Sequence, residues 1–424
     1  MAFSTLGLSP DLLAQLLPAL ERQGYRQPTA IQAQAVPAIV QGRDVIAAAP
    51  TGSGKTAAFV LPLLQQFALR PASRPRRVRA LVLVPTRELA TQVEAALATL
   101  GDGLPSRPKR VVAIGGVSIN PQMMALRGGA DIVVATPGRL LDLVARHALE
   151  LSAVATLVLD EADRLLDLGF GEELQRLLAL LPQERQTVLF SATFPPAVRQ
   201  LAATMLHEPV RIGGDEEEGA QAPDIAQRAI LVDAAQRTPL LRQLLDGQDW
   251  PQALVFVASR HAAETVAQKL RKAGIEAQPL HGELGQGRRS RTLQEFRDGA
   301  LRVLVATDVA ARGIDIPRLP VVVNYDLPRS PVDYTHRIGR TGRAGEPGLA
   351  VSFIDAAAEA HFRLIEKRRR QRVPREQVPG FEPRALPPAS PAASTDNGGV
   401  KGRRPSRKDR LRAAAQASGE PAAD

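Results

Sequence analysis

Three carboxylates stand close together in residues 158–163, which read V-L-D-E-A-D. Asp160, Glu161 and Asp163 directly follow an apolar run, so we expect a β-strand to end where they begin. Carboxylates at such a point either form a solvated turn or hold a divalent cation and activate a water molecule. The four letters D-E-A-D leave both interpretations open, and the choice depends on what else the chain brings to them.

A glycine-rich loop at residues 49–56, A-P-T-G-S-G-K-T, is a natural partner for these carboxylates. Because it follows an apolar run and precedes a helix-like segment, its backbone N–H groups are expected to surround phosphate oxygens at a helix N-terminus. Lys55 would reach the β- and γ-phosphates of a nucleoside triphosphate, and Thr56 would bind Mg²⁺. Ala49 stands where the usual pattern has glycine, and a chance Gly-Lys-Thr turn is the competing interpretation. The other phosphate-loop residues are Thr51, Gly52, Ser53 and Gly54.

The two motifs together give the carboxylates different tasks. Asp160 is expected to hold Mg²⁺, partly through water, and Glu161 to orient and deprotonate the attacking water. Lys55 and Glu161 are therefore candidate catalytic residues, while Thr56 and Asp160 are candidate metal ligands.

Short β-branched runs alternate with helix-length segments, and this predicts α/β domains, each built on a mainly parallel sheet flanked by helices. Nearly every run ends in a polar or glycine group, and ligands of open α/β sheets bind at the carboxyl ends of the strands. The runs lie at 44–49, 80–84, 110–114, 131–135, 156–159, 187–190, 253–257, 277–280, 302–306, 321–324 and 349–353.

The runs fall into two groups, so we expect domains at residues 1–212 and 225–383. Residues 213–224 are rich in glycine and acids and are expected to be a linker. Residues 384–424 are rich in Pro, Ala, Ser, Gly and Arg, which predicts a disordered basic tail. This tail is either an arm that tethers a polyanionic partner such as nucleic acid or merely a solubilising segment, and the sequence leaves the two open.

The amino-acid composition limits the kinds of partner that we expect this protein to bind. The 424 residues carry a net charge of +10, which favours a polyanion, while aromatic residues make up only 4%, which favours phosphate and sugar contacts over base stacking. The absence of cysteine excludes disulfides and Cys-ligated metals. No apolar run approaches the roughly 18 residues of a membrane span, and the first residues lack a secretory pattern. We therefore expect a cytoplasmic protein with no membrane partner.

In the order of its motifs, the chain over residues 3–380 resembles a DEAD-box ATP-dependent RNA helicase, most closely the bacterial RhlE-type subgroup. The resemblance implies two tandem RecA-like domains, with ATP and Mg²⁺ as cofactors. Besides the two motifs above, it rests on G-Y-R-Q-P-T-A-I-Q at 24–32, P-T-R-E-L-A at 85–90, G-G at 115–116, T-P-G-R at 136–139, S-A-T at 191–193, S-R at 259–260, H-G-E-L-G-Q-G-R-R at 281–289, A-T-D-V-A-A-R-G-I-D at 306–315 and H-R-I-G-R-T-G-R at 336–343.

The resemblance also implies contacts with the nucleoside. Gln32 would hydrogen-bond the adenine edge, with Tyr25 in the same motif, and Asp308 would meet the ribose. Phe3 is the candidate for packing on adenine, although it stands about one helical turn further upstream than the family pattern has it. An N-terminal residue that simply packs on the domain is the alternative for Phe3.

Coupling between nucleotide and RNA is implied at a second set of residues. The hydroxyls of Ser191 and Thr193 would hydrogen-bond Asp163, and His336 would relay the signal on the second domain. Arg340 and Arg343 would act as arginine fingers on the γ-phosphate when the two domains close. The implied contacts with the RNA backbone are Pro85, Thr86, Arg87, Gly116, Thr136, Arg139, Arg260, Gly282, Gln286, Arg289 and Thr307.

The function expected on this basis is an RNA-stimulated ATPase that couples ATP binding and hydrolysis to local separation of RNA duplexes or to remodelling of RNA–protein complexes. Its partner is RNA, single-stranded or in short duplexes, contacted through the backbone rather than the bases. Ribosomal and RNA-turnover complexes are family-level expectations. Two alternatives stay open: an ATP-gated RNA clamp with little unwinding, and a DNA-directed translocase of the same superfamily.

Overall fold

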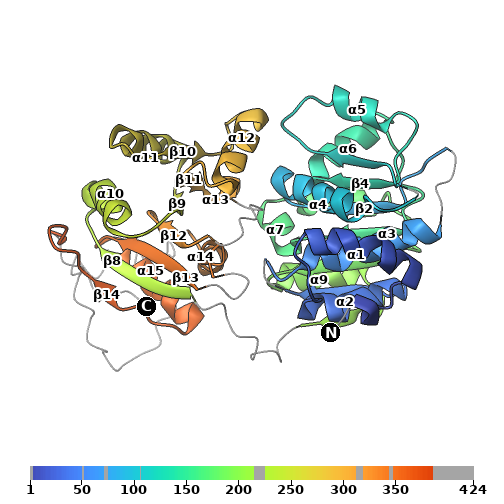
Figure 1. Cartoon of the computed structure of the whole chain (residues 1–424), viewed down its shortest axis with the longest axis horizontal. Helices are drawn as coiled ribbons and strands as arrows, with labels where there is room; N and C mark the ends of the chain where they lie inside the picture. The colour runs from blue at the N-terminus through green and yellow to red at the C-terminus, as the bar shows by residue number, and fades with distance from the viewer. Residues whose placement is uncertain are drawn as a thin grey trace, which may run out of the picture. The chain divides into compact units, whose positions relative to one another are not determined.

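The protein is described here from a computed structural model, shown as a cartoon in Figure 1. The structure describes residues 3–49, 52–70, 75–105, 107–213, 225–311, 319–342 and 347–384. The predicted roles of Thr51 and Arg343, nearly all of the expected linker, and the expected tail from residue 385 onward fall outside these ranges.

Seven strands form the first sheet, in the order β3-β4-β2-β5-β6-β1-β7, and all of their pairings are parallel. Except in β3 and β7, their side chains are almost entirely buried, as expected for a sheet covered on both faces. The strands are β1 (Val45–Ala48), β2 (Ala80–Leu83), β3 (Arg110–Ala113), β4 (Ile132–Ala135), β5 (Thr156–Leu159), β6 (Gln186–Ser191) and β7 (Val210–Ile212).

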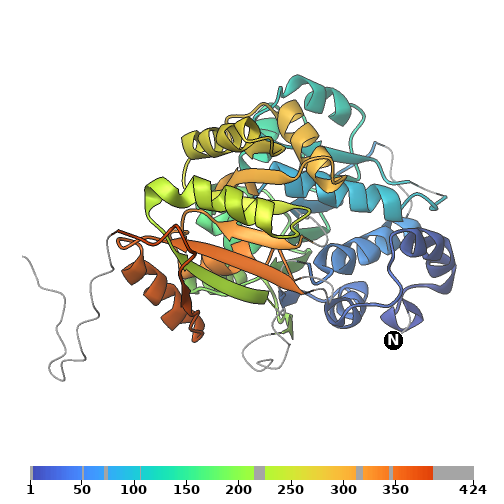
Figure 2. The same cartoon turned by 60° about the vertical axis from the view of Figure 1, so that its left-hand side comes forward.

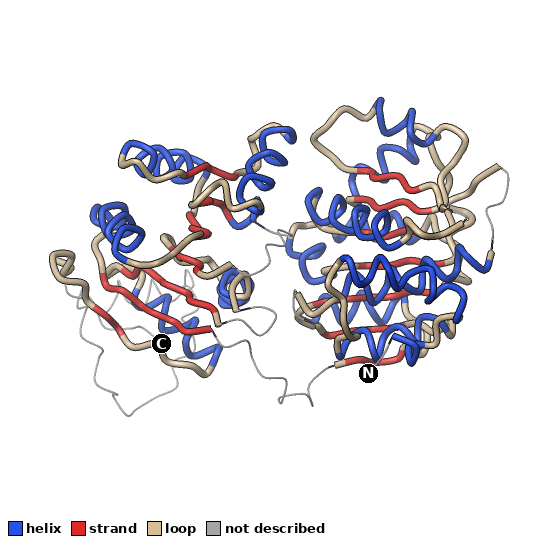
Figure 3. Tube along the Cα trace, viewed as in Figure 1, coloured by secondary structure: helices blue, strands red, loops and turns tan. Residues whose placement is uncertain are grey.

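Alternate residues of these strands enter two separate cores. Val82 packs with the first five helical segments, whereas its neighbour Leu81 packs with the other five, so each face of the sheet has its own helical layer (Figure 3). On the first face lie η1 (Phe3–Leu6), α1 (Pro10–Arg22), α2 (Ala30–Val40), α3 (Lys55–Leu69) and α4 (Arg87–Leu100); on the second lie α5 (Asn120–Leu126), α6 (Pro137–Ala145), α7 (Ala162–Asp167), α8 (Gly171–Leu178) and α9 (Pro196–Met205).

The second sheet repeats this arrangement with seven parallel strands in the order β10-β11-β9-β12-β13-β8-β14. The strands are β8 (Ile225–Leu231), β9 (Ala253–Val257), β10 (Ala277–Leu280), β11 (Val303–Thr307), β12 (Val321–Asn324), β13 (Gly348–Ile354) and β14 (Arg375–Glu376). The helical segments are η2 (Ala234–Gln236), α10 (Arg237–Gly247), α11 (Arg260–Lys272), α12 (Gln286–Arg297), α13 (Asp308–Ala311), α14 (Pro331–Ile338) and α15 (Glu359–Arg369).

Helices cover both faces of this sheet as well, as Figure 2 shows from a second direction. One core holds α10 and α11, and the opposite face carries one cluster with α12 and α13 and another with α14 and α15. The predicted fold, two RecA-like α/β domains in tandem, is therefore confirmed. Each of the eleven predicted runs overlaps a strand, whereas β7, β8 and β14 were not predicted.

A buried carboxylate ties three segments of the first domain together. Asp44, just before β1, accepts hydrogen bonds from the backbone N–H of Thr187 in β6 and from that of His207 after α9, both at 2.7 Å. Its residue surface is only 9% exposed. Because charged acceptors make the stronger hydrogen bonds, Asp44 holds the end of the sheet near β7 in place.

Asp44→Ala should lower the free energy of unfolding by about 2 to 4 kcal/mol, since it leaves two buried N–H groups unpaired. The measurement is urea unfolding followed by circular dichroism. Asp102→Ala is the control, because Asp102 pairs with Arg107 while both side chains are more than half exposed, and it should cost less than about 1 kcal/mol. Equal midpoints for the two variants would contradict the structural role of Asp44.

Candidate nucleotide and nucleic-acid site

The sheet order places three distant motifs on adjacent strands. Strands β5, β6 and β1 are neighbours, and the D-E-A-D turn, S-A-T and the phosphate loop stand at their carboxyl ends. On the other side of β5, strands β2, β4 and β3 lead into P-T-R-E, T-P-G-R and the glycine pair. One edge of the first sheet is thus divided between the predicted nucleotide motifs and the predicted RNA motifs.

The phosphate loop ends in a glycine that its geometry requires. Gly54 has φ 94°, and a Cβ atom there would lie 2.5 Å from Nε2 of Gln32. Lys55 begins α3 directly after it and is only 6% exposed. Its ammonium has no hydrogen-bond partner within the described residues. A buried, unpaired cation at a helix N-terminus is a strong site for phosphate oxygens.

The D-E-A-D turn is strained at its second residue. Glu161 has φ 53°, in the left-handed region that non-glycine residues rarely adopt, and it immediately precedes α7. Such a conformation costs on the order of 1 kcal/mol or more and persists where the surroundings enforce it. Asp160 helps to hold the turn, because its Oδ1 accepts a hydrogen bond of 2.9 Å from the backbone N–H of Glu161.

Burial changes the acidity of the first carboxylate. Removal from water raises the pKa of Asp160 from 3.8 to about 6, and the nearby Glu161 and Asp163 also raise it, whereas the charge of Lys55 and the hydrogen bond from the Glu161 backbone lower it. The Lys55 ammonium and the Asp160 carboxylate therefore interact, although they follow different strands. This is the arrangement expected of a site that receives a charged ligand.

The third carboxylate faces the neighbouring strand instead. Oδ2 of Asp163 accepts hydrogen bonds from Oγ1 of Thr193 at 2.7 Å and from its backbone N–H at 3.0 Å. The backbone N–H of Asp163 donates to Oγ of Ser191 at 3.2 Å, and that hydroxyl donates to the carbonyl of Thr193 at 2.7 Å. The structure thus brings the three predicted coupling residues of this domain into one buried network.

The predicted adenine contacts look different in the structure. Gln32 is fully buried; its Oε1 accepts from the backbone N–H of Thr29 at 3.0 Å and its Nε2 donates to the carbonyl of Gly54 at 3.1 Å. Its amide therefore holds the phosphate loop, and its contact with adenine stays a prediction. Phe3 is 5% exposed and packs in the first core, which matches the alternative given above, while Tyr25 is half-buried against the same core.

The P-T-R-E and glycine motifs meet through Arg87. Gly116 has φ 70°, a backbone conformation that favours glycine, and a Cβ atom there would displace the Arg87 guanidinium, which lies 2.0 to 2.2 Å from its position. Burial lowers the pKa of Arg87, and the positive charges of Arg289 and Arg139 lower it further, against the opposing effect of Glu88. Three guanidinium groups thus repel one another here, which an anionic ligand would relieve.

The other predicted contacts of this domain are more ordinary. Thr86 caps α4 by accepting a hydrogen bond of 3.2 Å from the backbone N–H of Leu89, Pro85 is buried beside it, and Thr136 precedes α6. Arg139 donates from Nη2 to the carbonyl of Val117 at 2.8 Å, but its Nε and Nη1 have no hydrogen-bond partner among the described residues.

In the second domain, several predicted RNA contacts are already paired. Arg289 is 5% exposed and forms an ion pair of 2.6 Å with Glu88 of the first domain. Arg260 is paired with Glu283. Gln286 begins α12 with its Oε1 buried and unpaired within the described chain, whereas Gly282 is exposed and Thr307 half-buried. The predicted contact of Arg289 with the RNA backbone stays a prediction, and in this structure Glu88 is the partner of its guanidinium.

Asp308, the predicted ribose contact, also has a protein partner, Arg337. Its two carboxylate oxygens accept hydrogen bonds from Nε and Nη2 of Arg337 at 2.6 and 2.8 Å. Arg337 also donates to the side chain of Asn324 and to the carbonyl of Asp326. The Asp308 carboxylate thus anchors α14 through Arg337, and its contact with a ribose stays a prediction.

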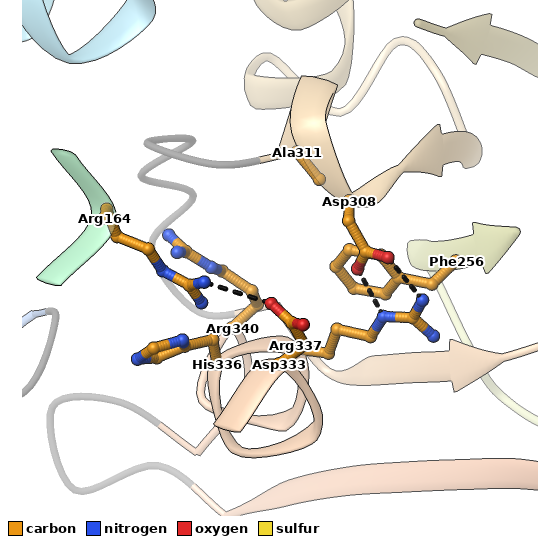
Figure 4. Close-up of a pocket in the computed structure, with 8 residues that line it drawn as sticks. All are labelled: Arg164, Phe256, Asp308, Ala311, Asp333, His336, Arg337 and Arg340. Carbon is orange, nitrogen blue, oxygen red and sulfur yellow. Dashed lines mark hydrogen bonds and ion pairs between the residues drawn. The ribbon is translucent and has the colours of Figure 1, made fainter. Parts of the chain in front are cut away.

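A contact that the motifs did not reveal joins the two domains. Arg164, which directly follows D-E-A-D, donates to Oδ1 of Asp333 on α14 at 3.0 Å (Figure 4). Both residues line a small pocket of about 10 Å³, together with His336 and Arg340, whose side chains are directed toward Arg164 in Figure 4. Arg164 stands next to a known motif but is an ordinary helix cation by sequence, so its partner was not predictable.

Asp160→Asn should stabilise the nucleotide-free protein. The pKa of Asp160 is raised on folding, so the wild type loses stability as pH rises from about 4 through about 6, and the variant does not. At pH 8 the variant should be more stable by roughly 1 to 3 kcal/mol, and near pH 4 the difference should vanish.

The measurement is urea unfolding in EDTA without nucleotide, at several pH values. Asp142→Asn is the control, because the Asp142 side chain is 64% exposed. A variant no more stable than the wild type at pH 8 would show that Asp160 is not a strained carboxylate.

Comparison with known proteins agrees with this geometry. Residues 29–201 match the family model of DEAD/DEAH box helicases, and residues 236–345 match that of the helicase conserved C-terminal domain. ATP-dependent RNA helicase DeaD of Mycobacterium tuberculosis is 42% identical over 380 residues, 90% of this chain and 65% of that protein, so the chain spans about two thirds of this relative. DEAD-box ATP-dependent RNA helicase CshA of Geobacillus kaustophilus is 39% identical, with 90% and 79% covered.

Solved structures of other proteins have a similar fold over most of this chain. Dbp5 of Saccharomyces cerevisiae bound to RNA and ADP BeF3 has a TM-score of 0.78 and 34% identity, covering 89% of this chain and 95% of that one. Mss116p bound to single-stranded RNA and AMP-PNP has a TM-score of 0.77 and 28% identity, covering 86% and 77%. With its family models matched in order and a relative matched over most of both lengths, the chain belongs to the DEAD/DEAH box helicase family.

Proposed function

We propose that this chain is an RNA-stimulated ATPase that uses ATP binding and hydrolysis to separate short RNA duplexes or remodel RNA–protein complexes. One observation carries the proposal: the buried Lys55 ammonium, which has no hydrogen-bond partner in the described part of the chain, interacts electrostatically with Asp160, beside the strained Glu161, where three parallel strands end. Relatives of this chain with the same fold are bound to RNA together with ATP analogues. ATP and RNA are accordingly its proposed ligands.

The donor groups of the site suit Mg²⁺. Magnesium takes hard oxygen ligands, keeps several waters and combines one or two carboxylates with substrate phosphates. Asp160 offers one buried carboxylate beside Lys55, and Thr56 offers a hydroxyl in the first turn of α3. These two residues would hold the ion, which when bound neutralises charge on the phosphate oxygens.

The protein's own residues would divide the hydrolysis step between them. Lys55 and the loop N–H groups bind the phosphates, with Thr51, Gly52, Ser53 and Gly54 forming the loop. Glu161 accepts a proton from the attacking water, whose oxygen bonds to the γ-phosphorus while the bond to the β–γ bridging oxygen breaks. Arg340, which lines the same small pocket as Arg164 and Asp333, stabilises charge on the transferring group, and Arg343 is proposed for the same role.

The RNA is proposed to bind along the other half of the sheet edge. Arg87, Arg139 and Arg289 raise one another's electrostatic energy, so a phosphate backbone would gain from all three. Arg289 must then exchange or share its ion pair with Glu88. Because backbone and glycine contacts dominate at this edge, we expect recognition of the sugar–phosphate chain and not of base sequence.

The finer assignments are also proposals. The RhlE-type subgroup rests on the motif sequence, whereas the relatives named above carry the names DeaD and CshA. The domain limits at 212 and 225, the cytoplasmic location and a place in ribosomal or RNA-turnover complexes rest on sequence pattern and family resemblance. No helix within the described ranges has the length and apolar character to span a membrane.

Glu161→Gln should lower RNA-stimulated ATP hydrolysis at least about 100-fold while ATP binding persists, because the amide cannot take the proton from water. The measurement is phosphate release without nucleic acid, with RNA and with DNA in parallel. Glu172→Gln, at an exposed position of α8, is the matched control and should keep full activity. Full turnover by Glu161→Gln would contradict the proposed role of Glu161 in hydrolysis. Equal stimulation of ATP hydrolysis by DNA would contradict RNA as the specific partner.

Asp163→Ala should separate binding from turnover. The variant loses both hydrogen bonds with Thr193, so nucleotide affinity should change less than about threefold whereas RNA-stimulated turnover falls more than about tenfold. A fluorescent ATP analogue reports the affinity, and phosphate release reports turnover. If ATP affinity collapses first, Asp163 belongs to the nucleotide site itself and not to its coupling.

A further inference from the structure

A second pocket lies at the amino ends of the strands of the first sheet, whereas the ATP and RNA motifs lie at their carboxyl ends. Its cavity measures about 240 Å³, and its lining includes Arg76, Arg77, Leu126, Gly129, Leu149 and Ala153. These residues lie in the segments that lead into β2, β4 and β5, so they stand at the amino ends of parallel strands. We call this cavity the basal pocket.

The local sequence explains why the space exists. Gly129 has φ 81°, and a Cβ atom there would lie 2.0 Å from the carbonyl oxygen of Arg76, so glycine lets the two segments approach closely. Ala130, Ala148 and Ala153 then line the cavity with small side chains beside Leu126. The volume lies below the roughly 300 Å³ at which small-molecule pockets begin, which suits one or two side chains of a peptide.

The rim of the basal pocket is positively charged. Asp131 is 1% exposed and forms ion pairs with Arg76 at 3.3 Å and Arg79 at 3.5 Å, so its charge is already compensated. Arg77 is exposed, and Lys109 donates to the carbonyl of Arg127 at 2.7 Å. Arg76 and Arg77 line the pocket together with one acid, Glu150. Arg79 and Lys109 lie behind them at Asp131, so these six described residues, four cations and two acids, carry a net charge of +2.

The lining favours a peptide over nucleic acid. None of the described residues that line the pocket is aromatic, so they offer bases no ring to stack on, while leucine and alanine offer contact to an aliphatic group. By composition the chain's own segment from residue 384 does not suit a basic rim, because it carries eight Lys and Arg against four acids. The acidic segment 214–224 follows Gly213 in the sequence. Gly213 lies against Ala48 at the carboxyl end of β1, whereas the basal pocket lies at the amino ends of the strands.

We propose that the basal pocket binds an acidic peptide segment of a partner protein, with an aliphatic side chain in the cavity and carboxylates on Arg76 and Arg77. Apolar anchors supply most of the affinity of such sites, and complementary charge adds specificity. Because the pocket is at the other edge of the sheet, a partner can occupy it while the ATP and RNA site is in use. The inference does not depend on the proposed chemistry.

The test uses the full chain and a phage-displayed library of random short peptides. Selected peptides, made synthetically, are titrated against protein that carries an environment-sensitive dye at Ser152→Cys, a unique thiol because the chain has no cysteine. We expect enrichment of acidic residues beside Leu, Ile, Val or Met, and a dye response on binding. A dye at Ala203→Cys, on exposed α9, should not respond.

Variants then locate the site. Arg77→Glu and the cavity-filling Ala153→Met should each weaken peptide binding roughly tenfold or more. The matched charge reversal Arg199→Glu, at an exposed position of α9, should change it less than about twofold. RNA-stimulated ATP hydrolysis is measured for every variant and should equal that of the wild type, so a failure of the pocket is distinguishable from a failure of the proposed function.

Three results would overturn the proposal. The library could yield no enriched peptide, or the enriched peptides could bind Arg77→Glu and Ala153→Met as tightly as the wild type. A dye response at Ser152→Cys to single-stranded RNA that competes with the peptides would instead make the rim a nucleic-acid contact.

Discussion

The whole site depends on one constraint, which is that every strand pairing in both sheets is parallel. Parallel strands bring all their carboxyl ends to one edge, so a motif placed after any strand must face the same side of the sheet. Strand order then decides which motifs meet. With the sequence β5-β6-β1, the D-E-A-D turn, S-A-T and the phosphate loop become neighbours although more than a hundred residues separate the first from the last.

Local sequence pattern was enough to predict the buried strands, because a run such as Leu81–Leu83 is apolar on both faces. It was not enough for β7, β8 and β14. β7 and β14 lie at sheet edges and have only three and two residues, while β8 lies next to an edge and has the polar pair Gln227 and Arg228 inside it, so their pairing comes from the tertiary structure. The left-handed backbone of Glu161 was equally invisible, since no propensity rule places a glutamate there.

A motif considered by itself does not predict which groups its residues contact. Gln32, Asp308 and Arg289 were each predicted to face a ligand, yet each has a protein partner: Gly54, Arg337 and Glu88 respectively. Motif residues are polar and buried, so in the absence of ligand they must satisfy one another. A sequence shows which groups have this capacity. It does not show which pairs form, because that depends on distances between segments that are far apart in the chain.

The turn at residues 160–164 explains how one short segment can serve both ligands. Asp160 interacts with Lys55, Asp163 binds Thr193 on β6, and Arg164 binds Asp333 on the second domain. These side chains leave a single strained turn and the first residues of α7, so none of them can shift far without moving the others. A change of charge at the phosphates would therefore be transmitted through covalent geometry to the contact with α14, without a longer chain of interactions.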